Sequence, residues 1–370
     1  MTRNVFFALI SLISFVFVAL TGCAPYDPCA FQNPDGSFRP GCEQVGDDTG
    51  DDTGSEGNAP TGWDRPFLDW HRTIDWSTAT LMSTDWGDIK WIDLDEVTLA
   101  VTTTEDPQEE FRASTDWGDW CAGNAGVEGT WYVPEDGDFS EMQDNGLAVF
   151  LQPDGSIVEV GMIQDCEGHF GGWILPGGDS DEKPDVYQDD GFTFWGGHGG
   201  SHLSALGGTI RLGELTGDGI DHVLAVEPNK LHLYYSADEA DGQPGYVWPA
   251  HSADSYASDH YIGSIPELQM GSLLAVPKSF NCSDLSTQPA TMICDALQTY
   301  GGLVVDDSWG EEDESEVAFS AELGVREEAM ATFNIELRDA GGSYATDIED
   351  IFRQVVVITN PQESWPTPTE

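Results

Sequence analysis

The stretch Leu147-Ala-Val-Phe-Leu-Gln-Pro-Asp-Gly-Ser-Ile-Val-Glu-Val160 decides the fold class of this chain. Apolar and β-branched residues flank a Pro-Asp-Gly segment at 153–155, which is typical of a turn between two antiparallel strands. Similar short runs recur between turn residues, at 130–133, 208–212, 222–226, 231–235, 246–248, 273–276, 303–305, 317–320 and 355–358. We therefore expect an all-β protein, and specifically a single β-sandwich of the jelly-roll type.

Two segments carry helical signals instead. Pro289 begins a segment that ends at Gly301 and places apolar residues at helical spacing, and proline at the start with glycine just after the end is typical of a helix. A shorter helix is expected from Thr346 to Gln354, where Ile348, Ile351 and Phe352 share one face. The sandwich should thus carry one or two short helices.

The amino-terminal segment predicts export. Arg3 precedes an apolar run from Val5 to Leu20, and Leu20-Thr-Gly-Cys23 follows the pattern of a bacterial lipoprotein signal. We expect cleavage before Cys23, lipid on that cysteine, and anchoring to a bacterial membrane, at the outer membrane or cell surface. An uncleaved anchor or an ordinary secretory signal is the alternative.

Composition divides the chain into four parts. Residues 1–22 form the expected signal peptide, and residues 23–62 are rich in Gly, Asp and Thr and poor in large apolar side chains. Such a segment cannot bury enough apolar surface to offset its ordering entropy, so we expect a disordered, acidic tether. Residues 63–362 should form the β-sandwich, and residues 363–370 a tail.

The chain has seven cysteines, and assigning Cys23 to lipid leaves six. An even number in an exported protein suggests three disulfides. Neighbours in sequence close the shortest loops, which favours the pairs Cys29–Cys42, Cys121–Cys166 and Cys282–Cys294, although six cysteines allow 15 connectivities.

The chain is strongly acidic, with 13 Lys and Arg against 67 Asp and Glu and a net charge of −54. Nucleic-acid binding depends on clusters of Lys and Arg, and none occurs here, so nucleic acid is excluded as an expected partner. This acidity suits a hydrated extracellular surface, cation binding or a salty habitat.

A short sequence that occurs twice places two tryptophans beside carboxylates. Ser83-Thr-Asp-Trp-Gly-Asp88 recurs as Ser114-Thr-Asp-Trp-Gly-Asp119, which contains Trp86 in the first copy and Trp117 in the second. Aromatic faces take the apolar faces of sugar rings while carboxylates accept from hydroxyls, so both are candidate saccharide-binding residues. The alternative is that they pack on the core.

A glycine-rich segment from Phe194 to His202 holds Trp195, His198 and His202. Glycine permits a close backbone approach to a ligand, so we expect this loop to present a binding tryptophan and two histidines to a groove. Polysaccharide cleavage would also need a charge-neutralising group and a base, for which Arg211 and His222 are further candidates. A structural bend with surface histidines is the alternative.

The stretch from Gly213 to His222 resembles a calcium loop. Glu214, Asp218 and Asp221 supply oxygen ligands near a glycine-enabled turn, which makes Ca²⁺ a candidate cofactor. A plain β-turn between two strands is the alternative.

Residues 196–357 resemble a family of secreted bacterial β-rich proteins that has no named activity. The resemblance rests on Gly197-His-Gly-Gly-Ser-His-Leu-Ser-Ala-Leu-Gly-Gly-Thr-Ile-Arg-Leu-Gly-Glu-Leu215, on Ile220-Asp-His-Val-Leu224, on Tyr246-Val-Trp-Pro-Ala250 and on Asp295-Ala-Leu-Gln-Thr-Tyr-Gly-Gly-Leu-Val-Val-Asp-Asp307. It implies a strand–turn–strand at 213–222 and carries no catalytic residues.

These features together predict a cell-surface lipoprotein that binds or degrades extracellular polysaccharide. The alternative is a non-catalytic structural or adhesive lipoprotein, and the sequence leaves open whether the protein is an enzyme. A concave groove that holds His198, His202 and Arg211 would favour the first function.

Overall fold

The computed structural model describes residues 67–114, 119–122, 127–135, 137, 139, 146–175, 184–186, 191–217, 219–236, 244–308, 316–338 and 341–367. The expected signal peptide, the lipidation site Cys23, the acidic tether and the Cys29–Cys42 pair lie outside these residues. Within them, no helix combines the length and the apolar character that crossing a membrane requires.

The strand prediction around residues 147–160 is confirmed. Strand β5 (Leu147–Leu151) pairs antiparallel with β6 (Ile157–Cys166). Gln152 donates its amide to the Ser156 carbonyl across the turn, and Gly155 has a φ of +87°, a conformation that favours glycine.

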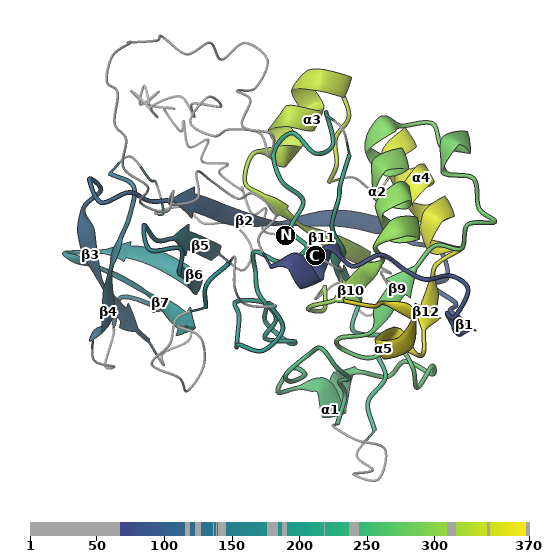
Figure 1. Ribbon diagram of the computed structural model, residues 1–370, viewed down its shortest axis with the longest axis horizontal. Helices are drawn as coiled ribbons and strands as arrows, with labels where there is room; N and C mark the ends of the chain where they lie inside the picture. Colours follow the sequence, from purple (N-terminus) through teal and green to yellow (C-terminus); the bar gives the residue numbers. More distant parts are fainter. Residues whose placement is uncertain are drawn as a thin grey trace, which may run out of the picture.

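The protein is mostly β, with twelve strands in one described sheet ordered β1-β12-β9-β10-β8-β11-β2-β5-β6-β7-β3-β4. The remaining strands are β1 (Leu81–Ser83), β2 (Trp91–Val101), β3 (Gln108–Ala113), β4 (Val127–Tyr132), β7 (His169–Leu175), β8 (Leu224–Pro228), β9 (Leu273–Ala275), β10 (Gly302–Val304), β11 (Glu316–Glu322) and β12 (Val356–Ile358). In Figure 1, β3 to β7 lie at one end and β9, β10 and β12 toward the other, with β2 running between them.

This sheet does not show the expected jelly roll. A jelly roll consists of two packed antiparallel sheets, whereas β2 pairs in parallel with β11 along its first half and with β5 along its second. Parallel neighbours also occur in the pairs β10–β8 and β3–β7. Alternation of apolar and polar residues marks a strand but fixes neither its direction nor its neighbours, which is why the pattern led to the wrong arrangement.

Helices cover one face of the sheet. The helices α2 (Gln288–Thr299), α3 (Val325–Phe333) and α4 (Ser343–Phe352) pack their apolar residues on β2, β8, β9 and β11 in one buried cluster. Figure 1 shows α2 and α4 side by side. Both predicted helices are thus confirmed, with α3 and the single-turn helices α1 (Ala257–His260) and α5 (Pro361–Ser364) in addition.

The opposite face of the sheet carries long irregular segments rather than helices. A second buried cluster joins residues of β2, β5, β8, β9, β10 and β12 to the 3-10 turn Leu68–His71 and to residues 192–206. A third cluster, centred on Phe111 and Phe150, lies at the β3–β7 end.

Two of the three expected disulfides are present. Cys121 bonds Cys166 across Cα atoms 5.6 Å apart, and Cys282 bonds Cys294 across 5.7 Å. The second pair ties the loop that enters α2 to that helix.

Candidate functional site

A cavity of about 880 Å³ lies against the sheet face that the irregular segments cover. Its wall is formed by strand residues of β2, β5, β6, β7, β8 and β11, by the glycine-rich loop and by segments 252–256 and 306–308. Seven of the described lining residues are acidic: Asp93, Asp95, Glu227, Asp254, Asp306, Asp307 and Glu316. Burying so many carboxyl groups is costly unless they are hydrogen-bonded, paired with a cation or protonated.

Strand register brings three of these acids together. Ala318 on β11 lies opposite Asp93 of β2 on one side and opposite Glu227 of β8 on the other, and Asp95 lies opposite Ser320. Side chains two residues apart point to the same side of a strand, so Asp93, Asp95 and Glu227 share one face of three neighbouring strands. The Ser320 hydroxyl donates to Glu227 at 2.8 Å.

Glu227 is only 3% exposed, and this burial has the largest effect on the ionisation of its carboxyl group. Its pKa lies well above the ordinary value because burial disfavours the charge, and the charges of Asp95 and Asp306 add to the effect. Both effects favour the protonated form of Glu227 at one wall of the cavity.

Asp306 holds the glycine-rich loop in place. The amides of Gly199 and Gly200 each donate to one of its carboxyl oxygens at 3.0 Å. A Cβ at Gly199 would lie 2.3 Å from an Asp306 oxygen, and one at Gly200 would lie 2.4 Å from an Asp254 oxygen, so larger residues do not fit. Burial, together with the charges of Asp254 and Asp307, raises the pKa of Asp306 well above its usual range.

Asp254 and Asp307 form a pair with two tyrosines. The Tyr256 hydroxyl donates to Asp307 at 3.1 Å, and the Tyr261 hydroxyl donates to Asp254 at 2.5 Å. Burial, reinforced by the charge of Asp254, raises the pKa of Asp307 to about 7. Burial also raises the pKa of Asp254. Interacting acids of this kind lose their protons in separate steps, so one carboxyl stays protonated when the other is charged.

One oxygen of this pair has no partner. Asp307 is 8% exposed, and its Oδ1 accepts no hydrogen bond, nor does the hydroxyl of the adjacent Ser308, which is 7% exposed. Both residues line the cavity. Buried polar atoms are normally satisfied, and these two would be satisfied by a ligand in the cavity.

Glu159, on strand β6, accepts hydrogen bonds from the glycine-rich loop and from the residues that follow it. The amides of Gly197 and Ala205 and the Ser204 hydroxyl all donate to this buried carboxyl, at 2.5, 2.9 and 2.5 Å. Its pKa is nevertheless raised, because burial outweighs the three donors. Glu159 thus holds the loop at Gly197 and just after its end, and Asp306 holds it at Gly199 and Gly200.

His202 is among the residues that line the cavity. Its ring stacks on Trp195 with centroids 4.3 Å apart, and Trp173 meets it edge-on at 5.3 Å. Burial and then the nearby His251 lower the pKa of His202 to about 4, so the ring is neutral at pH 7. Trp195 is 42% exposed and offers an aromatic face next to the cavity.

Backbone strain gathers at the same place. His202 and Met162 have positive φ angles of 54°, which side-chain-bearing residues rarely adopt, and both line the cavity. Met162 sits at a register shift of β6. Strained residues and bulges cluster at functional sites, which supports the assignment of the cavity as a site.

Other predicted residues lie elsewhere. His198 does not face a groove, because it is fully buried, with neither ring nitrogen hydrogen-bonded, and burial lowers its pKa to about 3. Trp86 is 3% exposed and packs edge-on against Phe352, so it belongs to the core as the alternative had it. Trp117 lies outside the described residues.

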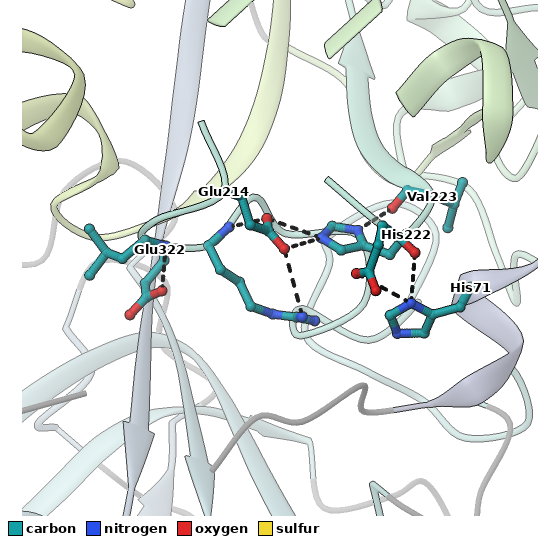
Figure 2. Close-up of polar contacts among 8 residues, drawn as sticks. His71, Glu214, His222, Val223 and Glu322 are labelled. Carbon is teal, nitrogen blue, oxygen red and sulfur yellow. Dashed lines mark hydrogen bonds and ion pairs between the residues drawn. The ribbon is translucent and has the colours of Figure 1, made fainter. Parts of the chain in front are cut away.

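Arg211 and His222 belong to a separate buried network. Figure 2 shows His222 facing Glu214, with His71 beside them. The Nε2 of His222 lies 3.1 Å from Glu214 and its Nδ1 lies 2.8 Å from the Val223 carbonyl, while an Arg211 nitrogen lies 4.0 Å from Glu214. Arg211 and His222 do not line the cavity, so the four catalytic candidates do not converge.

Two of the candidate calcium ligands, Glu214 and Asp221, form contacts within this network. Burial alone would raise the pKa of Glu214, but His222 and Arg211 outweigh it and lower the pKa, which leaves a carboxylate paired with them. The Nδ1–H of His71 donates to the backbone carbonyl of Asp221 at 2.8 Å, and Asp218 lies outside the described residues. Among the residues that the structure describes, no group of three or more His, Cys, Asp or Glu could hold a metal ion.

The acids of the cavity were not singled out from the sequence, although a signal existed. Asp93 and Asp95 alternate with Ile92 and Leu94, which is the pattern of a strand with one acidic face. Asp306 and Asp307 directly follow an apolar strand, and ligands commonly bind beyond the carboxyl ends of strands. What the sequence alone does not show is that these acids are buried together.

Comparison of the chain with known protein families, with characterised proteins and with solved structures gives no match. The function is therefore argued from the cavity and its chemistry.

Proposed function

We propose that the protein is an exported, lipid-anchored surface protein that binds extracellular polysaccharide in the acid-lined cavity and cleaves its glycosidic bonds. The proposal keeps the polysaccharide function expected from the sequence and moves the site from the four dispersed candidates to the cavity.

Two features support export. The Leu20–Cys23 motif follows the lipoprotein pattern, and the Cys121–Cys166 and Cys282–Cys294 disulfides are of the kind that persists in oxidising compartments. Polysaccharides are abundant outside cells, where such a protein would meet them.

The lining of the cavity suits a sugar. Trp173 and Tyr256 supply aromatic surface, and the carboxyl groups supply acceptors for hydroxyls. Trp195 extends the aromatic surface beyond the cavity, where a polymer could continue. A volume of about 880 Å³ falls in the usual range for ligand sites.

The Asp254–Asp307 pair supplies the chemistry. Glycoside hydrolysis needs one carboxyl that gives a proton to the glycosidic oxygen as its bond to the sugar carbon breaks, and one carboxylate that assists attack at that carbon. Asp307, with a pKa of about 7, is the acid, and Asp254, which accepts a hydrogen bond from the Tyr261 hydroxyl, is assigned as the carboxylate. Water adds to the sugar carbon and its proton replaces the one that Asp307 gave away.

The observation that carries the proposal is Asp307: a carboxyl buried in the cavity wall, protonated up to about neutral pH, with an oxygen that has no partner. General acids are tuned in this way by burial and by a neighbouring charge.

The test is a panel of neutral, acidic and amine-bearing polysaccharides incubated with the full chain, with release of reducing ends as the readout. We expect release from at least one of them by the wild type, a loss of at least about 100-fold in Asp307→Asn and in Asp254→Asn, and wild-type activity in the exposed control Asp259→Asn.

Binding to a polysaccharide without release of reducing ends would favour the non-catalytic adhesive alternative. Activity that persists in both Asp307→Asn and Asp254→Asn would show that the cavity pair is not the catalytic pair.

A further inference from the structure

The charge of the cavity is unbalanced. Among the described residues that line it, seven are acidic and none is Lys or Arg. Two cations lie close by. Arg338 pairs with Asp93 at 2.8 Å. The charge of Lys230 lowers the pKa of Asp307, but burial and the charge of Asp254 raise it by more. His202 adds no charge at pH 7.

The acids repel one another as a consequence. The charges of Asp95 and Asp306 act on Glu227, and those of Asp254 and Asp307 act on Asp306, so each pKa is raised further than burial alone would raise it. A neutral sugar in the cavity leaves this repulsion in place. A cation relieves it, because each carboxyl group then gains an opposite charge in a poorly solvated site.

The hydrogen-bonding groups of the cavity wall also favour a cationic ligand. Asp306 is satisfied by loop amides and Glu227 by Ser320, whereas Asp307 Oδ1 and the Ser308 hydroxyl are buried with no partner. An ammonium group carries three donors and no acceptor, which matches a wall of acceptors. Tyr256, which donates to Asp307, adds an aromatic face beside this position, and a cation is also attracted to such a face.

We propose that the cavity is specific for an amine-bearing saccharide, with the ammonium group at Asp307 and Ser308 and the sugar ring against Trp173 and Tyr256. This inference rests on the proposed polysaccharide function and adds the class of sugar that the site accepts.

The test uses single sugar rings, which contain no glycosidic bond to cleave. Glucosamine, galactosamine and mannosamine are each compared with the N-acetylated sugar and with the parent hexose, and spermidine serves as a cation without a sugar. Binding to the full chain is followed by titration at about pH 7, where the amines are still mostly protonated and Asp307, with a pKa of about 7, is about half ionised, and at about 0.15 M salt, which screens the exposed acidic surface.

We expect at least one amino sugar to bind about tenfold or more tightly than both of its uncharged counterparts. This preference should vanish in Asp307→Asn and weaken in Ser308→Ala. It should persist in Asp259→Asn, which removes an exposed acid that lies close in sequence to the cavity-lining residues 252–256. A preference unchanged in Asp307→Asn would place the amine on the general acidic surface and overturn the inference.

The outcomes separate the two proposals. If uncharged sugars bind as tightly as amino sugars, the amine specificity is overturned while the polysaccharide function stands. If spermidine binds and no sugar does, or if nothing binds, the amine specificity is overturned, and the polysaccharide function is decided by the release of reducing ends from the polymers.

Discussion

Replacing Asp307 by Asn should stabilise the protein at neutral pH. The Asp307 pKa is about 7 in the folded protein against 3.8 for an unperturbed aspartate, a difference of about 3 units. At 1.36 kcal/mol for each unit, ionisation of this group costs the folded state about 4 kcal/mol. Asn keeps an oxygen that can accept from Tyr256, yet it cannot ionise.

The sign follows from the direction of the shift. A carboxyl whose pKa is raised by folding contributes full stability below about pH 4, and that contribution is lost as the pH rises through about 7. Wild type and Asp307→Asn should therefore have similar free energies of unfolding near pH 4. By about pH 8 the free energy of unfolding of the variant should be larger by up to about 4 kcal/mol.

Urea unfolding at pH steps from about 4 to about 8 measures this difference directly, because the midpoint and slope give the free energy of unfolding at each pH. The exposed control Asp259→Asn should stay within about 0.5 kcal/mol of the wild type throughout. A variant that is less stable than the wild type at pH 8, with no change in the difference between pH 4 and 8, would refute the reasoning, since Asp307 would then be charged and well paired.

Three further outcomes are expected. Gly200→Ala should destabilise the fold by about 1–3 kcal/mol, because the new Cβ would lie 2.4 Å from an Asp254 oxygen. The control Gly341→Ala, whose Cβ would have no atom within 4 Å, should leave the stability unchanged, and equal melting temperatures of the two variants would contradict this. Replacing Cys121 and Cys166 by Ser opens a link between residues 45 apart and should cost about 3–4 kcal/mol in urea unfolding, and no loss would mean that the bond does not constrain the unfolded chain. Cys23→Ser should move the protein from the detergent phase to the aqueous phase, and unchanged partitioning would exclude lipid on Cys23.

Local structure was predictable where the pattern is local. The β5–β6 hairpin and helix α2 are each encoded by contiguous residues with their own turn and end signals. The runs at 208–212 and 231–235 are different: Ile210 and Leu233 are fully buried, yet each run makes only an isolated bridge. They are apolar because they cover the sheet, and apolar content alone does not distinguish a buried irregular segment from a strand.

The site was less predictable because it depends on pairing between distant strands. Asp93, Glu227 and Asp306 are separated by more than 200 residues of sequence from first to last, and only the parallel and antiparallel registers of β11 and the loop contacts bring them together. The glycine-rich loop stands out in the sequence by its composition, but which of its two histidines reaches the cavity depends on the fold. His202 reaches the cavity wall and His198 turns into the core.

The central claim, that Asp307 is the general acid of the cavity, is tested most directly by the pH dependence of kcat/KM for reducing-end release from a cleaved polysaccharide. We expect activity to fall tenfold for each pH unit above a midpoint near 7, as the Asp307 proton is lost, and to be absent at every pH in Asp307→Asn. An activity that stays constant from about pH 6 to about pH 9, or one that Asp307→Asn retains, would contradict the account.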